Sequence, residues 1–258
     1  MTSIISRNNM TKHKNSATNG FVTILFWLLV WYLAALGMDK PLLLPTPAQV
    51  FRCLGELVVT AGFWQITLTS IGRVLLGLLL GIVLGVLLAV LTASSSLLHG
   101  LIAPAMTAMQ ATPVASFAIL VLIWVDRNEV PVLICCMMAL PVVWHNVSGG
   151  IRVTDPQLLE MANVYRLSLR TRIRRIYVPS VLPFFRTACA SAMSLAWKAG
   201  IAAEVLTLPK ISIGKMIAES KMYLLTPELF AWTLTVIVLS LLLQKIMLRL
   251  LQGRDDHD

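Results

Sequence analysis

The side chains best suited to chemistry or recognition gather in the segment 151–180, where charge is unusually dense for this chain. Five arginines fall within ten positions there, and two carboxylates, Asp155 and Glu160, precede them. Asp155 is a suitable helix N-cap, and proline at position 156 suits the first helical turn. Side chains then recur at helical spacing at Leu158, Leu159, Ala162 and Tyr165. This pattern predicts binding by a short amphipathic helix, and no bond-making chemistry.

A second short helix is predicted to start at Ser168 in the same segment. It would place Ile173, Ile176 and Tyr177 on one face and arginines on the others. Pro179 and Pro183 are predicted to end it and to lead into the next apolar segment. Two such helices form a docking element for a protein partner, and some of the arginines would meet anionic lipid headgroups.

Two further ionisable residues, Lys198 and Glu204, lie inside an apolar segment. Ionisable residues within membrane spans are candidates for a transport path, but both could also be structural or snorkel towards water. Six residues separate them, which is about 240° around a helix, so they are not predicted to pair with each other. The sequence leaves both interpretations open.

Enzymatic and metal sites are not indicated. The four cysteines show no C-x-x-C spacing, and the four histidines are scattered. The stretch "SIGKM" at 212–216 contains Gly-Lys but lacks the earlier glycine of a phosphate-binding loop. We therefore predict no catalytic residue, no metal and no cofactor, and any ATP chemistry must come from another subunit.

The elements that position these residues are apolar. Of the 258 residues 57% are hydrophobic and only 13% charged, and no Lys, Arg, Asp or Glu occurs from Val74 to Val125. Because one membrane-spanning helix needs about 20 apolar residues, the chain is predicted to be an all-α polytopic membrane protein. Charge-free windows give six spans, at about 21–37, 67–93, 101–125, 130–149, 182–206 and 229–248. The first could be a signal peptide, but a retained anchor is favoured by its length.

The distribution of basic residues predicts the orientation. Twelve Lys and Arg flank one set of span ends, including the segment 151–180, and six flank the other. The positive-inside rule then places both termini and this segment in the cytoplasm. The net charge of +9 does not form a soluble patch with aromatic platforms, so no nucleic acid partner is predicted.

Small residues and prolines predict how the spans pack. Gly77, Gly81 and Gly85 recur every four residues, which favours close approach of another helix over a lipid-facing surface. Pro104 and Pro113 predict bends in the third span, of the kind that line cavities.

The segment 151–180 resembles the "EAA" coupling loop of inner-membrane permease subunits of bacterial ABC importers, E-A-A-x3-G-x9-I-x-L-P. The matching positions are Glu160, Met161, Ala162, Arg166, Ile176, Val178 and Pro179, with methionine, arginine and valine as departures. Because the family's glycine allows a sharp helix-ending turn, Arg166 must adopt a left-handed conformation or the turn must be reshaped. The resemblance implies that these residues couple the permease to an ATPase.

Other stretches extend the resemblance over about 42–250, closest to nitrate-, taurine- and sulfonate-type permeases. They are "LLPTPAQVFRCLGEL", "TLTSIGRVLLGLLLGIVLGVLLAV", "PVVWHNVSGGIRVTDPQLLEMA" and "AWKAGIAAEVL". The family's later G-L-G is "SIG" here. The translocation-path candidates are Asn146, Trp197 and Glu204, which stand at matching positions of these stretches, together with the ionisable Lys198.

The resemblance implies a MetI-like, type I ABC importer permease in the inner membrane of a bacterium. Its partners would be cytoplasmic ABC ATPase subunits, an extracytoplasmic substrate-binding protein, a second permease copy and the lipid bilayer. The expected parts are a cytoplasmic tail 1–20, a first span 21–37, an extracytoplasmic segment 38–66, a core 67–248 and a cytoplasmic tail 249–258. The substrate would be a nitrate-, sulfonate- or taurine-like anion or a related small molecule. The alternatives are a secondary transporter or channel and, less well supported, an intramembrane enzyme.

Overall fold

The computed structural model describes residues 22–38, 40 and 42–252, and all the regular structure in these ranges is helical. The all-α prediction is confirmed. The predicted tail 1–20 and the last six residues of the predicted tail 249–258 lie outside the described residues. The basic residues counted there, Arg7, Lys12, Lys14 and Arg254, therefore have no structural description.

The chain enters the described part as a helix, Val22–Met38. The following elements are α2 (Pro47–Val58), α3 (Ala61–Ala93), α4 (Ser96–Ala111), α5 (Val114–Val121), α6 (Val130–Arg152), α7 (Pro156–Val164), α8 (Leu169–Arg172), the π-helical turn η1 (Ile173–Tyr177), α9 (Val178–Thr207), α10 (Ile213–Met222) and α11 (Thr226–Gln252).

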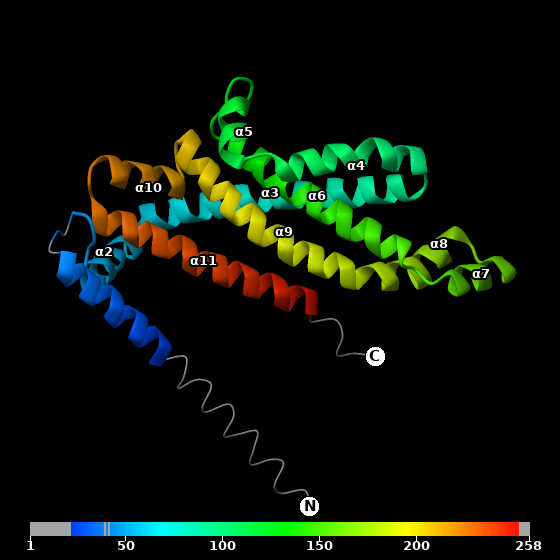
Figure 1. Ribbon diagram of the computed structural model, residues 1–258, viewed down its shortest axis with the longest axis horizontal. Helices are drawn as coiled ribbons and strands as arrows, with labels where there is room; N and C mark the ends of the chain where they lie inside the picture. Colours follow the sequence, from blue (N-terminus) through cyan, green and yellow to red (C-terminus); the bar gives the residue numbers. More distant parts are fainter. Residues whose placement is uncertain (1–21, 39, 41, 253–258) are drawn as a thin grey trace, which may run out of the picture.

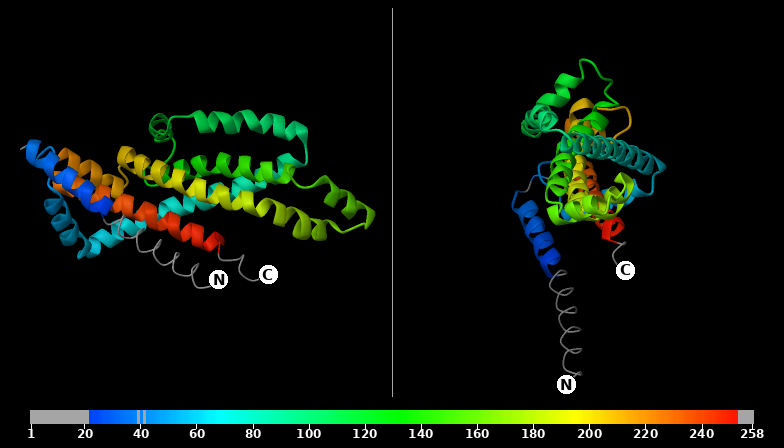
Figure 2. Two further views of the ribbon diagram at one scale, coloured as in Figure 1. Left: turned by 60° about the horizontal axis from the view of Figure 1, so that its bottom comes forward. Right: turned by 90° about the vertical axis from the view of Figure 1, so that its right-hand side faces the viewer.

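The long helices α3, α6, α9 and α11 run along the long axis of the molecule (Figures 1 and 2). The short helices α7 and α8 lie at one end, and α2 and α10 lie at the other. Three helices, α3, α6 and most of α11, are long and apolar enough to cross a membrane. The bent pair α4 and α5 makes a fourth candidate span, so the count of six stays a prediction.

The central contact of the bundle is between α3 and α6. A Cβ at Gly77 would collide with the Val132 carbonyl, and one at Gly81 would lie 2.6 Å from Ala139 Cβ. A Cβ at Gly85 would lie 2.8 Å from Val143 Cβ. The predicted close approach is confirmed: the three glycines face α6 and not lipid, because any side chain there would push the two helices apart.

The third predicted span, 101–125, is not one helix. It breaks after Ala111, and α5 leaves α4 at an angle of 102°. Pro113 lies at the break, as the N-cap residue directly before α5, so the predicted bend is confirmed there. Pro104, in contrast, lies inside α4. The break is sharp because Pro113 cannot donate the backbone hydrogen bond that would continue α4.

The prediction that Pro179 and Pro183 end a helix is wrong. Helical structure continues from Leu169 through η1 into α9, with Pro179 in the first turn of α9 and Pro183 inside it. In the widened turn before Pro179, the Val178 N–H bonds to the Ile173 carbonyl, five residues back. A π-helical turn of this kind leaves room for a residue that cannot join the regular ladder.

Candidate functional site

Helix α7 begins where its sequence signals predict. Asp155 Oδ1 accepts a hydrogen bond from the Gln157 backbone N–H at 2.8 Å, and Pro156 occupies the first helical position. The side chain of Asp155 thus satisfies one of the N–H groups that a helix start leaves without a partner. The predicted N-cap is confirmed.

Helix α7 ends in a left-handed turn at Arg166, where φ is 50°. The Arg166 N–H bonds to the Asn163 carbonyl at 3.0 Å, and the Leu167 N–H bonds to the Ala162 carbonyl at 2.9 Å. These two bonds form a Schellman motif, in which glycine is the usual left-handed residue. Of the two alternatives for Arg166, the chain adopts the left-handed conformation and keeps the turn.

The outer face of α7 is apolar and open. Val164 is 79% exposed and Tyr165 72% exposed, and Leu158 and Met161 are exposed on the same side. Glu160 lies one turn before Val164 and is also exposed. Helix α7 lies at the tip of the molecule, beyond the ends of the long helices (Figure 1). Helix α7 therefore presents an exposed apolar face that no other described element covers.

Two of the predicted coupling residues point inward instead. Ala162 and Ile176 are both buried, so Ala162 provides space within its own chain and not for a partner. The predicted common face of the second helix is also only partly formed, because Ile173 is 54% exposed. The π-helical turn explains the difference, since it changes the angular spacing of the side chains that follow Ile173.

At the opposite end of the molecule, Glu204 is fully buried in a polar cluster. Its Oε2 accepts hydrogen bonds from Ser70 Oγ at 2.8 Å and from the Gly214 N–H at 3.1 Å. Ser70 Oγ in turn accepts from the Ile213 N–H at 2.9 Å. The carboxylate therefore joins α3, α9 and the start of α10.

Arg73 completes this cluster. Its guanidinium lies 3.4 Å from Glu204 Oε1 and donates to the Ile211 carbonyl at 2.6 Å. The snorkelling interpretation of Glu204 is therefore wrong: its charge is met by protein groups and not by water. A buried carboxylate needs such partners, and this one links helix ends at a single point.

The other translocation-path candidates do not meet one another. Trp197 is buried and donates to the Val236 carbonyl at 3.2 Å, so it packs α9 on α11. The half-buried Asn146 donates to the carbonyl of Val142 on its own helix at 2.8 Å. Lys198 is exposed on the open face of α9 and does not pair with Glu204.

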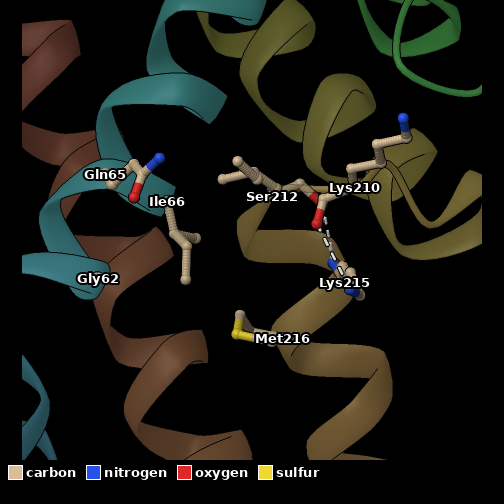
Figure 3. Close-up of a pocket in the computed structure, with 8 residues that line it drawn as sticks. Gly62, Gln65, Ile66, Lys210, Ser212, Lys215 and Met216 are labelled. Carbon is tan, nitrogen blue, oxygen red and sulfur yellow. Dashed lines mark hydrogen bonds between the residues drawn. The ribbon is translucent and has the colours of Figure 1, made fainter.

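A cavity of about 210 Å³ opens beside α10, lined mainly by residues of α3 and of the segment 210–216 (Figure 3). Lys215 Nζ bonds to the Lys210 carbonyl at 3.4 Å and pairs with Glu219 at 3.5 Å. In Figure 3 the Lys210 side chain points away from Gln65 and Ile66 across the cavity. None of the predicted site residues lines this cavity.

The sequence reasoning missed Arg172, Ser70 and Arg73 as site residues. Arg172 reaches back to the end of α7, and the other two hold Glu204. A basic residue after a helix end is a weak sequence signal. Ser70 and Arg73 lie more than 130 positions before Glu204, so only the fold reveals their contact.

The fold and these sites define a class of protein: a multi-span helical membrane protein with a short helix, apolar on its exposed face, at one end. Within the described ranges, no three His, Cys, Asp or Glu side chains cluster as metal ligands would. Residues 77–254 match the family described as the binding-protein-dependent transport system inner membrane component. The chain belongs to this family, the inner-membrane permeases of ABC importers.

Curated relatives agree over most of the chain. The riboflavin transport system permease protein of Chloroflexus aurantiacus is 29% identical over 88% of this chain and 88% of its own. A Bacillus subtilis permease, provisionally named for aliphatic sulfonates, is 26% identical over 81% of this chain and 75% of its own. The taurine transport system permease protein of Escherichia coli is 24% identical over 90% and 86%. These relatives are transport permeases, so the chain is a transport subunit and not an enzyme.

Proposed function

We propose that this chain forms the translocation pathway of an ABC importer and docks on a separate ATPase through α7. The observation that carries the proposal is the open apolar face of α7, with Val164 and Tyr165 the most exposed. In water such a face has a free-energy cost that a protein partner would remove. The family assignment displaces the alternative of a secondary transporter or channel.

The proposed orientation places α7 in the cytoplasm and α10 outside. Support comes from the charge asymmetry of the sequence and from the separation of α7 and α10 at opposite ends of the bundle (Figures 1 and 2). A substrate-binding protein would then dock at the α10 end, and two permease copies would enclose the pathway. ATP-driven closure of the ATPases would push α7 and switch the pathway by rigid-body motion.

The proposed solute is a small anion or a related organic molecule. The relatives are named for sulfonates, taurine, bicarbonate and riboflavin, so family membership alone does not fix the substrate. Lys198 favours an anion, because among the described residues it is the one exposed charge on an open face of α9 that carries Thr187 and Ser191 beside the apolar Leu195. The open faces of α3 and α11 instead carry leucine, isoleucine and valine, which suit lipid.

Docking is tested by retention of the cognate ATPase on tagged permease. Val164→Asp should reduce retention at least tenfold, because a charge would be buried in an apolar contact. Val59→Asp is the matched control, since Val59 is 87% exposed at the opposite end of the molecule. Equal retention by both variants, at equal expression, would refute docking through α7.

Glu160 provides a second test of the same surface. If docking buries its carboxylate against a basic or amide group, removing one partner costs about 3–5 kcal/mol. Glu160→Ala should then weaken ATPase docking by about 10²-fold or more, while the permease still inserts and dimerises. Unchanged docking would mean that Glu160 stays in solvent in the complex.

A further inference from the structure

Arg172 makes all the hydrogen bonds between α7 and the helix that follows it, as far as the described residues show. Its Nη1 donates to Asn163 Oδ1 at 2.7 Å, and its Nη2 donates to the Ala162 carbonyl at 3.2 Å. Its Nε donates to the Leu167 carbonyl at 3.0 Å. Three different nitrogens of one planar group therefore bind three acceptors around the end of α7.

These acceptors are at the place where α7 is least supported. No other helix packs along α7 in the described part of the chain, and the views agree that it projects from the bundle (Figures 1 and 2). The Ala162 carbonyl already accepts from the Leu167 N–H in the Arg166 turn, so Arg172 adds a second hydrogen bond to it and also binds the Leu167 carbonyl. A cation there also interacts favourably with the helix dipole.

Arg172 is in turn part of a continuous helix. It is the last residue of α8, which passes through η1 into α9. The start of α8 is fixed locally, since Ser168 Oγ accepts from the Thr171 N–H at 3.3 Å. One side chain thus connects the projecting helix directly to the long helix that crosses the bundle.

We propose that Arg172 is a positioning residue that locks α7 to α8 and α9, so that a push on α7 moves α9 as one body. This inference rests on the proposed docking of an ATPase at α7. Without the contacts of Arg172, α7 would rotate about residues 165–167. Movement of a bound ATPase would then rotate α7 and would not be transmitted to α9. The neighbouring Arg170 and Arg174 are exposed and provide matched controls on the same segment.

The direct test measures the distance between spin labels on Gln157 of α7 and Thr187 of α9, both exposed. Cys53, the one cysteine that is not buried, is replaced by serine first. Labelled full-length permease is diluted with unlabelled permease so that only distances within one chain are measured. Arg172→Gln should broaden the distance distribution, and Arg170→Gln should leave it narrow. Equal widths in the two variants would overturn the proposal.

Coupling is measured in proteoliposomes with the ATPase and the binding protein. Arg172→Gln should lower solute transported per ATP hydrolysed roughly tenfold. Adding Asn163→Ala to Arg172→Gln should cause little further loss, because both remove the same contact. An additive loss would overturn the shared contact. If wild-type permease bound no ATPase, the proposed function would fail, while the distance measurement would still decide the lock.

Discussion

Replacing Arg166 by glycine should stabilise the end of α7. An L-residue in the left-handed region costs about 1–2 kcal/mol, and Arg166 has φ of 50°. Glycine avoids that cost but gives back about 0.5–1 kcal/mol through its greater freedom in the unfolded chain. With the middle of each range the net gain is about 0.75 kcal/mol, which corresponds to about a three- to fourfold shift in the local opening equilibrium.

Hydrogen exchange of peptides that cover the Arg166 turn measures this shift. Arg166→Gly should slow their exchange about three- to fourfold and should leave ATPase retention equal to wild type or higher. Arg170→Gly is the control: its backbone is helical in α8, so glycine there should speed exchange. If Arg166→Gly speeds exchange as much as the control, or abolishes ATPase binding, the arginine makes a stabilising contact and the argument from φ is wrong.

Other perturbations test the remaining sites. Orientation is tested by cysteine labelling at two exposed positions, Leu169 (77% exposed) and Val59 (87% exposed). Leu169→Cys should react only from the cytoplasm and Val59→Cys only from outside. The reverse pattern would refute the orientation. Glu204→Ala should destabilise the permease by about 3–5 kcal/mol, measured by thermal unfolding, because it removes the acceptor of Ser70 and the charge that faces Arg73. A loss below about 1 kcal/mol would contradict the cluster. A cysteine at Lys198 should react with water-borne methanethiosulfonate reagents, and failure to react would place this face in lipid. Hydrogen bonds from Asn128, chiefly from its backbone N–H, lower the pKa of Asp126 below 3.8. The loop 122–129 should therefore hold its fold at neutral pH and loosen only as pH falls through that lowered pKa. Pepsin cleavage of the loop should therefore increase at low pH relative to Asp126→Asn, and equal cleavage of both would contradict the assignment.

Local signals predicted much of the structure. The start of α7 followed from Asp155 and Pro156, because a cap and a first-turn proline act within a few residues of the chain. The contact of α3 with α6 followed from three glycines at a spacing of four. Arg166 illustrates the limit of such signals, since the sequence indicated a constraint and only the structure showed which of two conformations satisfied it.

Long-range contacts were beyond the sequence. Glu204 was located by its unusual position in an apolar segment, but its partners come from α3 and α10, far along the chain. Pro183 misled in the other direction, because proline usually ends a helix and here the helix continues. Tertiary packing and the widened turn outweigh the local preference at that point.

The π-helical turn Ile173–Tyr177 gives the length of this segment a role separate from its composition. A turn bonded five residues back holds one residue more than a regular helical turn. Deleting one residue there would allow an ordinary α-helix to form, with little loss of hydrogen bonding. Because the extra residue is taken up within one turn, everything before the deletion, α7 included, would keep nearly the same direction around the axis of α9. A deletion in the regular part of α9 would instead rotate α7 by about 100°. The shortened chain would fold with its docking face on the same side of the bundle, so this junction should tolerate a single-residue deletion that the regular turns of α9 would not.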